Sequence, residues 1–198
     1  MTTVQFLYDF GSPNAYLAHK VIPEIETRTG VRFEYVPVLL GGIFKLTNNR
    51  PPMIAFGEVK GKMAYEMRET ERFIARHKLG AFKFNPFFPV NTLGLMRIAT
   101  GANGDRRTVD ALFHHMWEDP KKMDEPEVVR AALLESGLDA DALIAASQTP
   151  ETKQMLMAAT EDAANRGVFG SPSFFVGSEL FFGKDRLRDV EEEIAKAG

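Results

Sequence analysis

A serine at the junction of a predicted strand and a predicted helix is the first residue whose position suits chemistry. Residues 4–9 (VQFLYD) form a β-rich run that stops at Gly11-Ser12-Pro13, and apolar residues at helical spacing follow it. The free N–H groups and the positive dipole end of a helix N-terminus favour an anion. His19 lies two turns further along, too far to activate the hydroxyl. Ser12 is therefore expected to be either a simple N-cap or a hydrogen-bond donor, and not an attacking group.

Ser171-Pro172 is the second candidate, because it stands directly before an apolar run at residues 173–176 (SFFV). A proline cannot serve a central strand ladder, so the chain must turn tightly as it enters this strand. A cis bond would suit such an entry, whereas the local sequence alone favours the commoner trans form. Only the fold can decide between the two.

The absence of cysteine restricts the chemistry that this chain can perform with its own side chains. It excludes disulfides, thiolate metal sites and a catalytic cysteine, so any thiol chemistry must use a borrowed thiol. His114 and His115 are adjacent on a predicted helix and should face different directions, and no metal-binding motif accompanies them. We interpret them as core or surface histidines and expect no metal site.

Charge balance and hydropathy argue against two classes of partner. The 198 residues include 24 basic and 27 acidic side chains, dispersed along the chain, which gives a net charge of −3. Duplex binding needs a clustered basic face, so no nucleic acid partner is expected. No stretch approaches the roughly 18 apolar residues of a membrane span, and the first residues lack a targeting pattern. We expect a cytoplasmic protein that does not enter a membrane.

The order of predicted elements gives an α/β fold that an all-α segment interrupts. Residues 4–40 form a predicted βαβ unit, and residues 173–197 a predicted β-hairpin followed by a helix from Asp185. Between them the pattern is helical, apart from loops at 47–52 and 82–89. Helices are expected at 61–77, 91–100, 106–117, 125–136, 140–146 and 152–166. The predicted domains are 1–45 together with 167–198, and an inserted helical domain at 46–166.

Four sequence blocks occur in the order of a known family. They are FLYDFGSPNAYL at residues 6–17, NRPP at 49–52, GVFGSP at 167–172 and FGKDRL at 182–187. Together with the element order, they resemble the thioredoxin-superfamily branch that carries an all-α insertion. Within that branch, the chain resembles the 2-hydroxychromene-2-carboxylate isomerases and their relatives, the kappa-class glutathione transferases. The resemblance covers essentially the whole chain and implies a thioredoxin-like fold.

The resemblance implies glutathione as the cofactor and assigns roles to residues of these blocks. Ser12 would be the catalytic residue that holds the glutathione sulfur, where related thiol oxidases have the first cysteine of Cys-x-x-Cys. The backbone of Ser171, beside a cis Pro172, would pair with the tripeptide like an added strand. Further contacts are implied for Asn49, Lys60, Lys184 and Asp185, of which Asp185 would meet the γ-glutamyl amine. Lys62 is the alternative to Lys60, because the preceding loop can differ in length.

The implied activity is a glutathione-dependent isomerase of aromatic catabolism. It would interconvert 2-hydroxychromene-2-carboxylate and trans-o-hydroxybenzylidenepyruvate, or a related small aromatic substrate, and would act as a homodimer. The aromatic residues that could wall a substrate site, unless they are purely structural, are Phe82, Phe84, Phe87, Phe88 and Trp117. Asn91 or a nearby lysine could orient the carboxylate. A kappa-type transferase that consumes glutathione, and a non-catalytic glutathione-binding protein, remain alternatives.

Overall fold

A four-stranded sheet carries both loops that the sequence singled out. The computed structural model describes residues 3–197. In it, β1 (Val4–Tyr8) pairs in parallel with β2 (Phe33–Pro37) and antiparallel with β3 (Ser173–Val176). β4 (Glu179–Phe182) pairs antiparallel with β3, so the strand order is β2-β1-β3-β4. Because Leu7 of β1 opposes Ser173 of β3, the loop that leaves β1 lies beside the loop that enters β3.

Local capping fixes the start and the end of α1 (Pro13–Thr29), the helix that follows β1. Ser12 is the N-cap, and Pro13 takes the first helical position, where a missing N–H costs nothing. Gly30 ends the helix in the left-handed region, at φ 70°, with its N–H bonded to the Glu26 carbonyl (2.9 Å). The predicted βαβ unit is confirmed.

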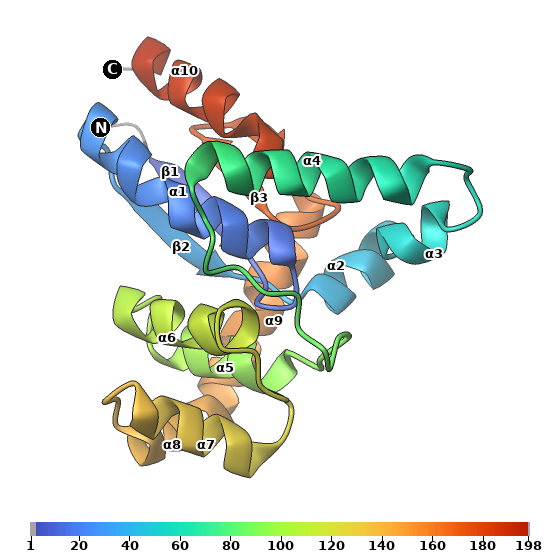
Figure 1. The fold of residues 1–198 in the computed structure, drawn as a ribbon. Helices are drawn as coiled ribbons and strands as arrows, with labels where there is room; N and C mark the ends of the chain where they lie inside the picture. The colour runs from blue at the N-terminus through green and yellow to red at the C-terminus, as the bar shows by residue number, and fades with distance from the viewer. Residues whose placement is uncertain (1–2, 198) are drawn as a thin grey trace.

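The two faces of the sheet bury different helices, because successive strand residues point to opposite sides. Phe6 of β1 and Phe174 of β3 stack at 5.4 Å in a cluster that also holds the apolar face of α1. On the other face, Leu7 and Phe175 pack with Ala163 of α9 (Pro150–Asn165). In Figure 1, α1 crosses in front of β1 and β2.

The segment between β2 and β3 is helical, as predicted, with two local differences. The strand expected up to residue 40 ends at Pro37, and the expected loop at 47–52 is shorter because a helix begins at Pro52. Proline is tolerated there because the first turn of a helix does not need its N–H. The helices before α9 are α2 (Leu40–Thr47), α3 (Pro52–Phe56), α4 (Lys62–His77), α5 (Leu93–Gly101), α6 (Arg106–Trp117), α7 (Pro126–Glu135) and α8 (Ala140–Gln148).

One cluster of buried side chains continues from the strands into the helical segment. It includes Val4 of β1, Leu95 of α5 and Leu112 of α6, and α5 to α9 pack against one another (Figure 1). The core is therefore shared across the expected domain boundaries at 45 and 167, and the division into two domains stays a prediction. Within residues 3–197, none of the helices combines the length and apolar character that a bilayer crossing demands.

The C-terminal hairpin and helix are confirmed, with a short turn between them. Gly177 makes the tight connection from β3 to β4 at φ 60°. After β4, a single 3-10 turn, η1 (Lys184–Arg186), precedes α10 (Leu187–Ala197). The helix that was expected from Asp185 therefore begins two residues later, and α10 packs on α1.

Candidate active site

Ser12 and Ser171, which are 159 residues apart in sequence, meet where β1 ends and β3 begins. The Ser12 hydroxyl donates to the Ser171 carbonyl oxygen (2.9 Å) and accepts from the Ala15 N–H of α1 (3.2 Å). Both serines are buried, and the Ser171–Pro172 bond is cis, as the resemblance predicts. The structure thus joins the two turns that the sequence singled out.

The cis-proline loop is held from two sides, by Asn49 of the predicted site and by Gly183, which precedes Lys184. Asn49, which follows α2, donates from Nδ2 to the Phe169 carbonyl oxygen (2.8 Å). On the other side, the Gly183 N–H donates to the Pro172 carbonyl oxygen (2.9 Å). The first contact brings Asn49 next to the loop, and the second ties the loop to the start of η1.

Lys184 and Asp185 form an ion pair at the start of η1. Lys184 is buried, and its Nζ lies 3.0 and 2.9 Å from the two carboxylate oxygens of Asp185. The same ammonium lies 5.2 Å from the centre of the Phe73 ring of α4, within the range of a cation–π contact. The Asp185 side chain is 62% exposed, so its carboxylate remains accessible to an external cation.

The two alternative lysines lie between α3 and α4. Lys60 is exposed, and Lys62 pairs with Glu66 one turn further along α4 while its Nζ lies 5.7 Å from the Phe56 ring. Among the residues that the structure describes, no hydrogen bond or ion pair links either lysine to Ser12, Ser171 or Asp185. The choice between Lys60 and Lys62 therefore stays open.

Asp9 is the residue of the site that sequence reasoning missed. Its side chain is buried, and Oδ1 accepts from the Gly11 N–H (2.8 Å) and the Thr92 hydroxyl (2.7 Å), while Oδ2 accepts from the Leu40 N–H (2.7 Å). Its own N–H donates to the Ser171 hydroxyl oxygen (3.1 Å). Burial raises the pKa of Asp9, although these three donors oppose the shift. An aspartate directly after an apolar strand was the available signal.

The predicted aromatic wall is largely part of the core. Trp117 is fully buried, donates from Nε1 to the Phe10 carbonyl oxygen (2.8 Å), and stacks with Phe82 at 6.0 Å between ring centres. Phe84 and Phe87 are about half exposed and are the rings of this set that a ligand could reach. Asn91, the suggested carboxylate contact, is exposed and accepts from the Leu93 N–H (3.1 Å).

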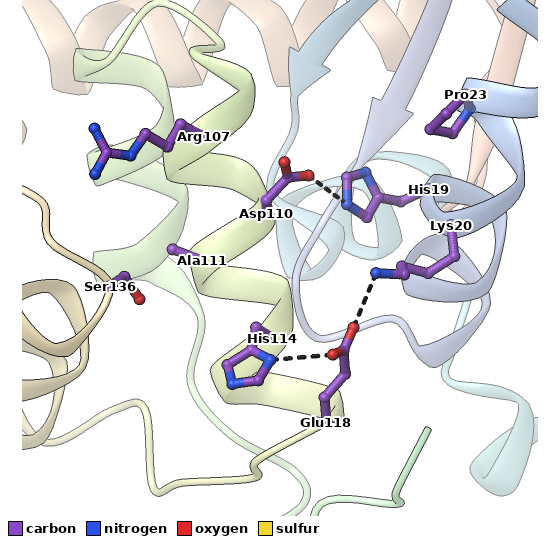
Figure 2. Close-up of a pocket in the computed structure, with 9 residues that line it drawn as sticks. All are labelled: His19, Lys20, Pro23, Arg107, Asp110, Ala111, His114, Glu118 and Ser136. Atoms are coloured by element: carbon purple, nitrogen blue, oxygen red, sulfur yellow. Dashed lines mark hydrogen bonds and ion pairs between the residues drawn. The ribbon is translucent and has the colours of Figure 1, made fainter. Parts of the chain in front are cut away.

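A second polar site lies between α1 and α6, where sequence reasoning placed none. A pocket of about 520 Å³ is lined by residues of both helices and by Glu118 just beyond α6 (Figure 2). Glu118 accepts from the Tyr16 hydroxyl (3.0 Å) and lies 3.1 Å from both Lys20 Nζ and His114 Nδ1. Burial alone would raise the pKa of Glu118, but the contacts from His114, Lys20 and Tyr16 outweigh it and hold the pKa below its usual value.

His19, on the wall of this pocket, has both ring nitrogens occupied. Nδ1 bonds to the Tyr35 hydroxyl (2.9 Å), and Nε2 lies 2.9 Å from an Asp110 carboxylate oxygen. Burial lowers the pKa of His19 even though Asp110 acts in the opposite direction. Both ring nitrogens of His19 therefore contact other residues than Ser12. This agrees with the inference that His19 does not activate the Ser12 hydroxyl.

Comparison with known proteins gives consistent results. The sequence profile of the DSBA-like thioredoxin domain matches residues 3–195. A 2-hydroxychromene-2-carboxylate isomerase from Sphingobium xenophagum is 32% identical over 193 residues, 96% of each chain, and glutathione S-transferase kappa 1 from Homo sapiens is 26% identical over 93% of this chain and 87% of its own. A solved structure of a 2-hydroxychromene-2-carboxylate isomerase matches the fold with a TM-score of 0.78, at 23% identity over 98% of this chain and 95% of that one.

The raised pKa of Asp9 predicts a specific pH dependence of stability. Between the ordinary value of 3.8 and the higher folded value, the native state binds more protons than the unfolded state, so Asp9 stabilises the fold progressively as pH falls. The free energy of unfolding of wild type, minus that of Asp9→Asn, should therefore increase on acidification in urea titrations. Asp141→Asn is the control, because Arg130 lowers the pKa of Asp141 and the difference should shrink or stay constant. If the difference in unfolding free energy between wild type and Asp9→Asn did not change with pH, the prediction would be contradicted.

Proposed function

The chain belongs to the DSBA-like thioredoxin domain family, in the branch of 2-hydroxychromene-2-carboxylate isomerases and kappa-class glutathione transferases, and we propose that it is a glutathione-dependent isomerase. The proposed reaction interconverts 2-hydroxychromene-2-carboxylate and trans-o-hydroxybenzylidenepyruvate, or a closely related aromatic compound. The observation that carries the proposal is the pairing of Ser12, at a helix N-terminus, with the backbone of Ser171 beside a cis proline.

Glutathione supplies the thiol that this chain lacks. Lowering a thiol pKa from about 8.5 to about 6.5 requires roughly 2.7 kcal/mol of preference for the thiolate. A hydrogen bond to a charged group contributes about 1.5–3 kcal/mol, and a helix N-terminus about 0.3–1 kcal/mol. Ser12 and the start of α1 meet that requirement without a protein base. A reduced thiol persists where the cell keeps thiols reduced, so the cytoplasm is the proposed location.

The Ser12 hydroxyl must change its acceptor to perform this role. Its proton is bonded to the Ser171 carbonyl oxygen, so glutathione takes over two partners at once. The sulfur accepts from Ser12, and the Ser171 backbone pairs with the tripeptide in the manner of an added strand. The exchange gives the Ser12 hydroxyl a charged acceptor in place of a neutral one, which strengthens the Ser12 bond.

The remaining predicted contacts surround this pair. Asp185 is exposed and suits the γ-glutamyl amine, and buried Lys184 fixes its carboxylate. Asn49 borders the cis-proline loop through Phe169 and can reach the tripeptide backbone. Lys60 or Lys62 would approach the peptide's carboxylates from the segment between α3 and α4.

The proposed reaction returns glutathione unchanged. In the proposed cycle, the thiolate adds to the conjugated carbon of the chromene, the double bond shifts toward the hemiketal carbon, and the ring C–O bond breaks with its electron pair going to the phenolate oxygen. The resulting enol can rotate about the former double bond. The enol then loses its proton, which passes to the phenolate, and the returning electrons restore the double bond and expel the thiolate. The electron pair that formed the carbon–sulfur bond returns to sulfur, so the cycle consumes no glutathione.

We also propose that the protein is a homodimer, joined through an apolar surface on α3 and α4. Six large apolar side chains of this short stretch are strongly exposed: Met53, Ile54, Phe56, Val59, Tyr65 and Met67. Exposed apolar side chains concentrated in one surface segment are typical of an interaction site. A second copy of the chain would bury them symmetrically.

Replacement of the Ser12 hydroxyl should separate glutathione binding from thiol activation. In Ser12→Ala, calorimetry should still detect reduced glutathione, whereas ultraviolet titration should show the bound thiol pKa raised by about 1 to 2 pH units, since one charge-assisted hydrogen bond is lost. Ser173→Ala is the matched control, because that buried hydroxyl donates to the Gly170 carbonyl oxygen instead. An unchanged thiol titration in Ser12→Ala would reduce Ser12 to a helix cap, and absence of wild-type binding at millimolar glutathione would refute the cofactor.

A turnover experiment distinguishes isomerase from transferase. The protein incubated with 2-hydroxychromene-2-carboxylate and substoichiometric glutathione should form more product than the glutathione supplied, with free thiol undiminished. Stoichiometric loss of thiol and a conjugate in the mass spectrum would identify a kappa-type transferase. If binding is intact but neither outcome appears, the substrate assignment is wrong.

A charged residue in the apolar surface should dissociate the dimer. Ile54→Lys places an ammonium among exposed apolar side chains, so light scattering at micromolar concentration should shift from dimer mass to monomer mass. Leu134→Lys, at a half-exposed leucine on α7 outside this surface, should leave the mass unchanged. A monomeric wild type, or dissociation by Leu134→Lys alone, would contradict the proposed interface.

A further inference from the structure

We propose that His114, His115 and Asp119 form a binding site for a divalent transition-metal ion at the C-terminal end of α6. One potential ligand atom from each side chain lies within 4.8 Å of the other two. His115 is buried, His114 is half-buried and Asp119 is exposed, so an ion can enter from the Asp119 side. The site shares no residue with the Ser12 site and does not depend on the proposed function.

The backbone explains how two adjacent histidines and a more distant aspartate converge. Adjacent helical residues point in different directions, yet the rings of His114 and His115 lie 4.9 Å apart. The chain then folds back over the end of α6, because the Asp119 N–H donates to the His114 carbonyl oxygen (3.0 Å) and the Lys121 N–H to the His115 carbonyl oxygen (2.9 Å). This turn places the Asp119 carboxylate beside the imidazoles.

The partners of the two imidazoles leave one nitrogen of each ring for a metal. His114 Nδ1 lies 3.1 Å from a Glu118 carboxylate oxygen, so Nε2 is the available ligand. His115 Nε2 bonds to the Ser136 hydroxyl (3.0 Å), and its Nδ1 is buried without a hydrogen-bond partner among the described residues. A buried ring nitrogen without a partner is costly, and a metal ion would satisfy it. A carboxylate on the far nitrogen, as His114 has, is a usual outer partner of a metal-bound histidine. The Ser136 hydroxyl oxygen can accept from His115 in the same way.

Lys121 occupies the place where a cation would be attracted. Its ammonium lies 3.1 Å from an Asp119 carboxylate oxygen and is also paired with Glu135. The two carboxylates that hold this ammonium would also attract a metal ion. An ion at Asp119 would displace Lys121 from that carboxylate and leave it paired with Glu135, so no buried charge is stranded.

The donor set selects the class of metal. Two imidazole nitrogens and one carboxylate oxygen suit Zn²⁺ and its neighbours, whereas Mg²⁺ and Ca²⁺ require mainly oxygen ligands. Three protein ligands leave a coordination position free for water or a small anion. His114 also lines the pocket between α1 and α6 (Figure 2), so the proposed metal site borders that pocket.

Zinc titration of the metal-free, full-length protein tests the site by binding alone. Calorimetry with chelator competition should show one Zn²⁺ per chain, and Co²⁺ should give visible absorption bands of a nitrogen–oxygen site. Asp119→Asn, an exposed isosteric change, should weaken zinc binding by at least about tenfold, and Ser136→Ala, which removes an outer partner, by about 10–100-fold. Lys121→Met should tighten binding, because it removes the competing ammonium.

Controls separate this site from adventitious zinc. Asp124→Asn removes an exposed carboxylate of the same loop that is outside the site, and it should leave the affinity unchanged. Circular dichroism of each variant checks that the fold is intact. Absence of zinc binding to wild type would overturn the proposal. So would equal affinities for wild type, Asp119→Asn and Lys121→Met, which would assign the ion to another part of the surface.

Discussion

A buried carboxylate, Asp9, is the interaction on which the geometry of the site depends. It binds the Leu40 N–H at the start of α2 and the Thr92 hydroxyl before α5, while its backbone holds Ser12 and Ser171. A carboxylate removed from water costs several kcal/mol unless donors replace the lost solvent. Displacement of any one of these segments would leave a donor or a carboxylate oxygen unpaired. The starts of α1, α2 and α5 are therefore fixed together around the end of β1.

The buried Asp9 side chain also limits which residues can occupy the turn between β1 and α1. A Cβ on Gly11 would lie 3.3 Å from Asp9 Oδ1 and 3.3 Å from Thr92 Cγ2, which is tighter than ordinary contact. On the other side, Trp117 donates to the Phe10 carbonyl oxygen (2.8 Å). Hydrogen bonds from Leu40 of α2 to Asp9 and from Trp117 of α6 to Phe10 thus hold the turn in place. Ser12 would therefore need no backbone movement to meet a ligand. Only its hydroxyl has to rotate.

Structural features that local chemistry fixes could be predicted, and contacts that only the tertiary structure makes could not. Ser12 was identified as an N-cap candidate because capping is local, whereas the cis form of the Ser171–Pro172 bond followed from the resemblance, since the local sequence favours trans. The contacts of Asp9 with Leu40 and Thr92 span 31 and 83 residues and leave no periodic signal. The pocket around Glu118 was missed for the same reason, because Tyr16 lies 102 residues away. The helix at Pro52 was missed because proline was treated only as a helix breaker.

The polar contacts between α1 and α6 affect the Ser12 site because they fix the position of α1, the helix that Ser12 caps. Tyr16 and Lys20 contact Glu118, and His19 contacts Asp110. These three residues of α1 lie within about two turns of Ser12. A partly exposed ion pair contributes at most about 1 kcal/mol, so these contacts do not decide the stability of the fold. Apolar packing tolerates small sliding of a helix, whereas directional hydrogen bonds fix its register. Stabilisation of an anion by a helix terminus falls off within one turn. A helix fixed in this way would keep its first N–H groups at a constant distance from the sulfur of the proposed glutathione, and such a constant distance would favour the thiolate form.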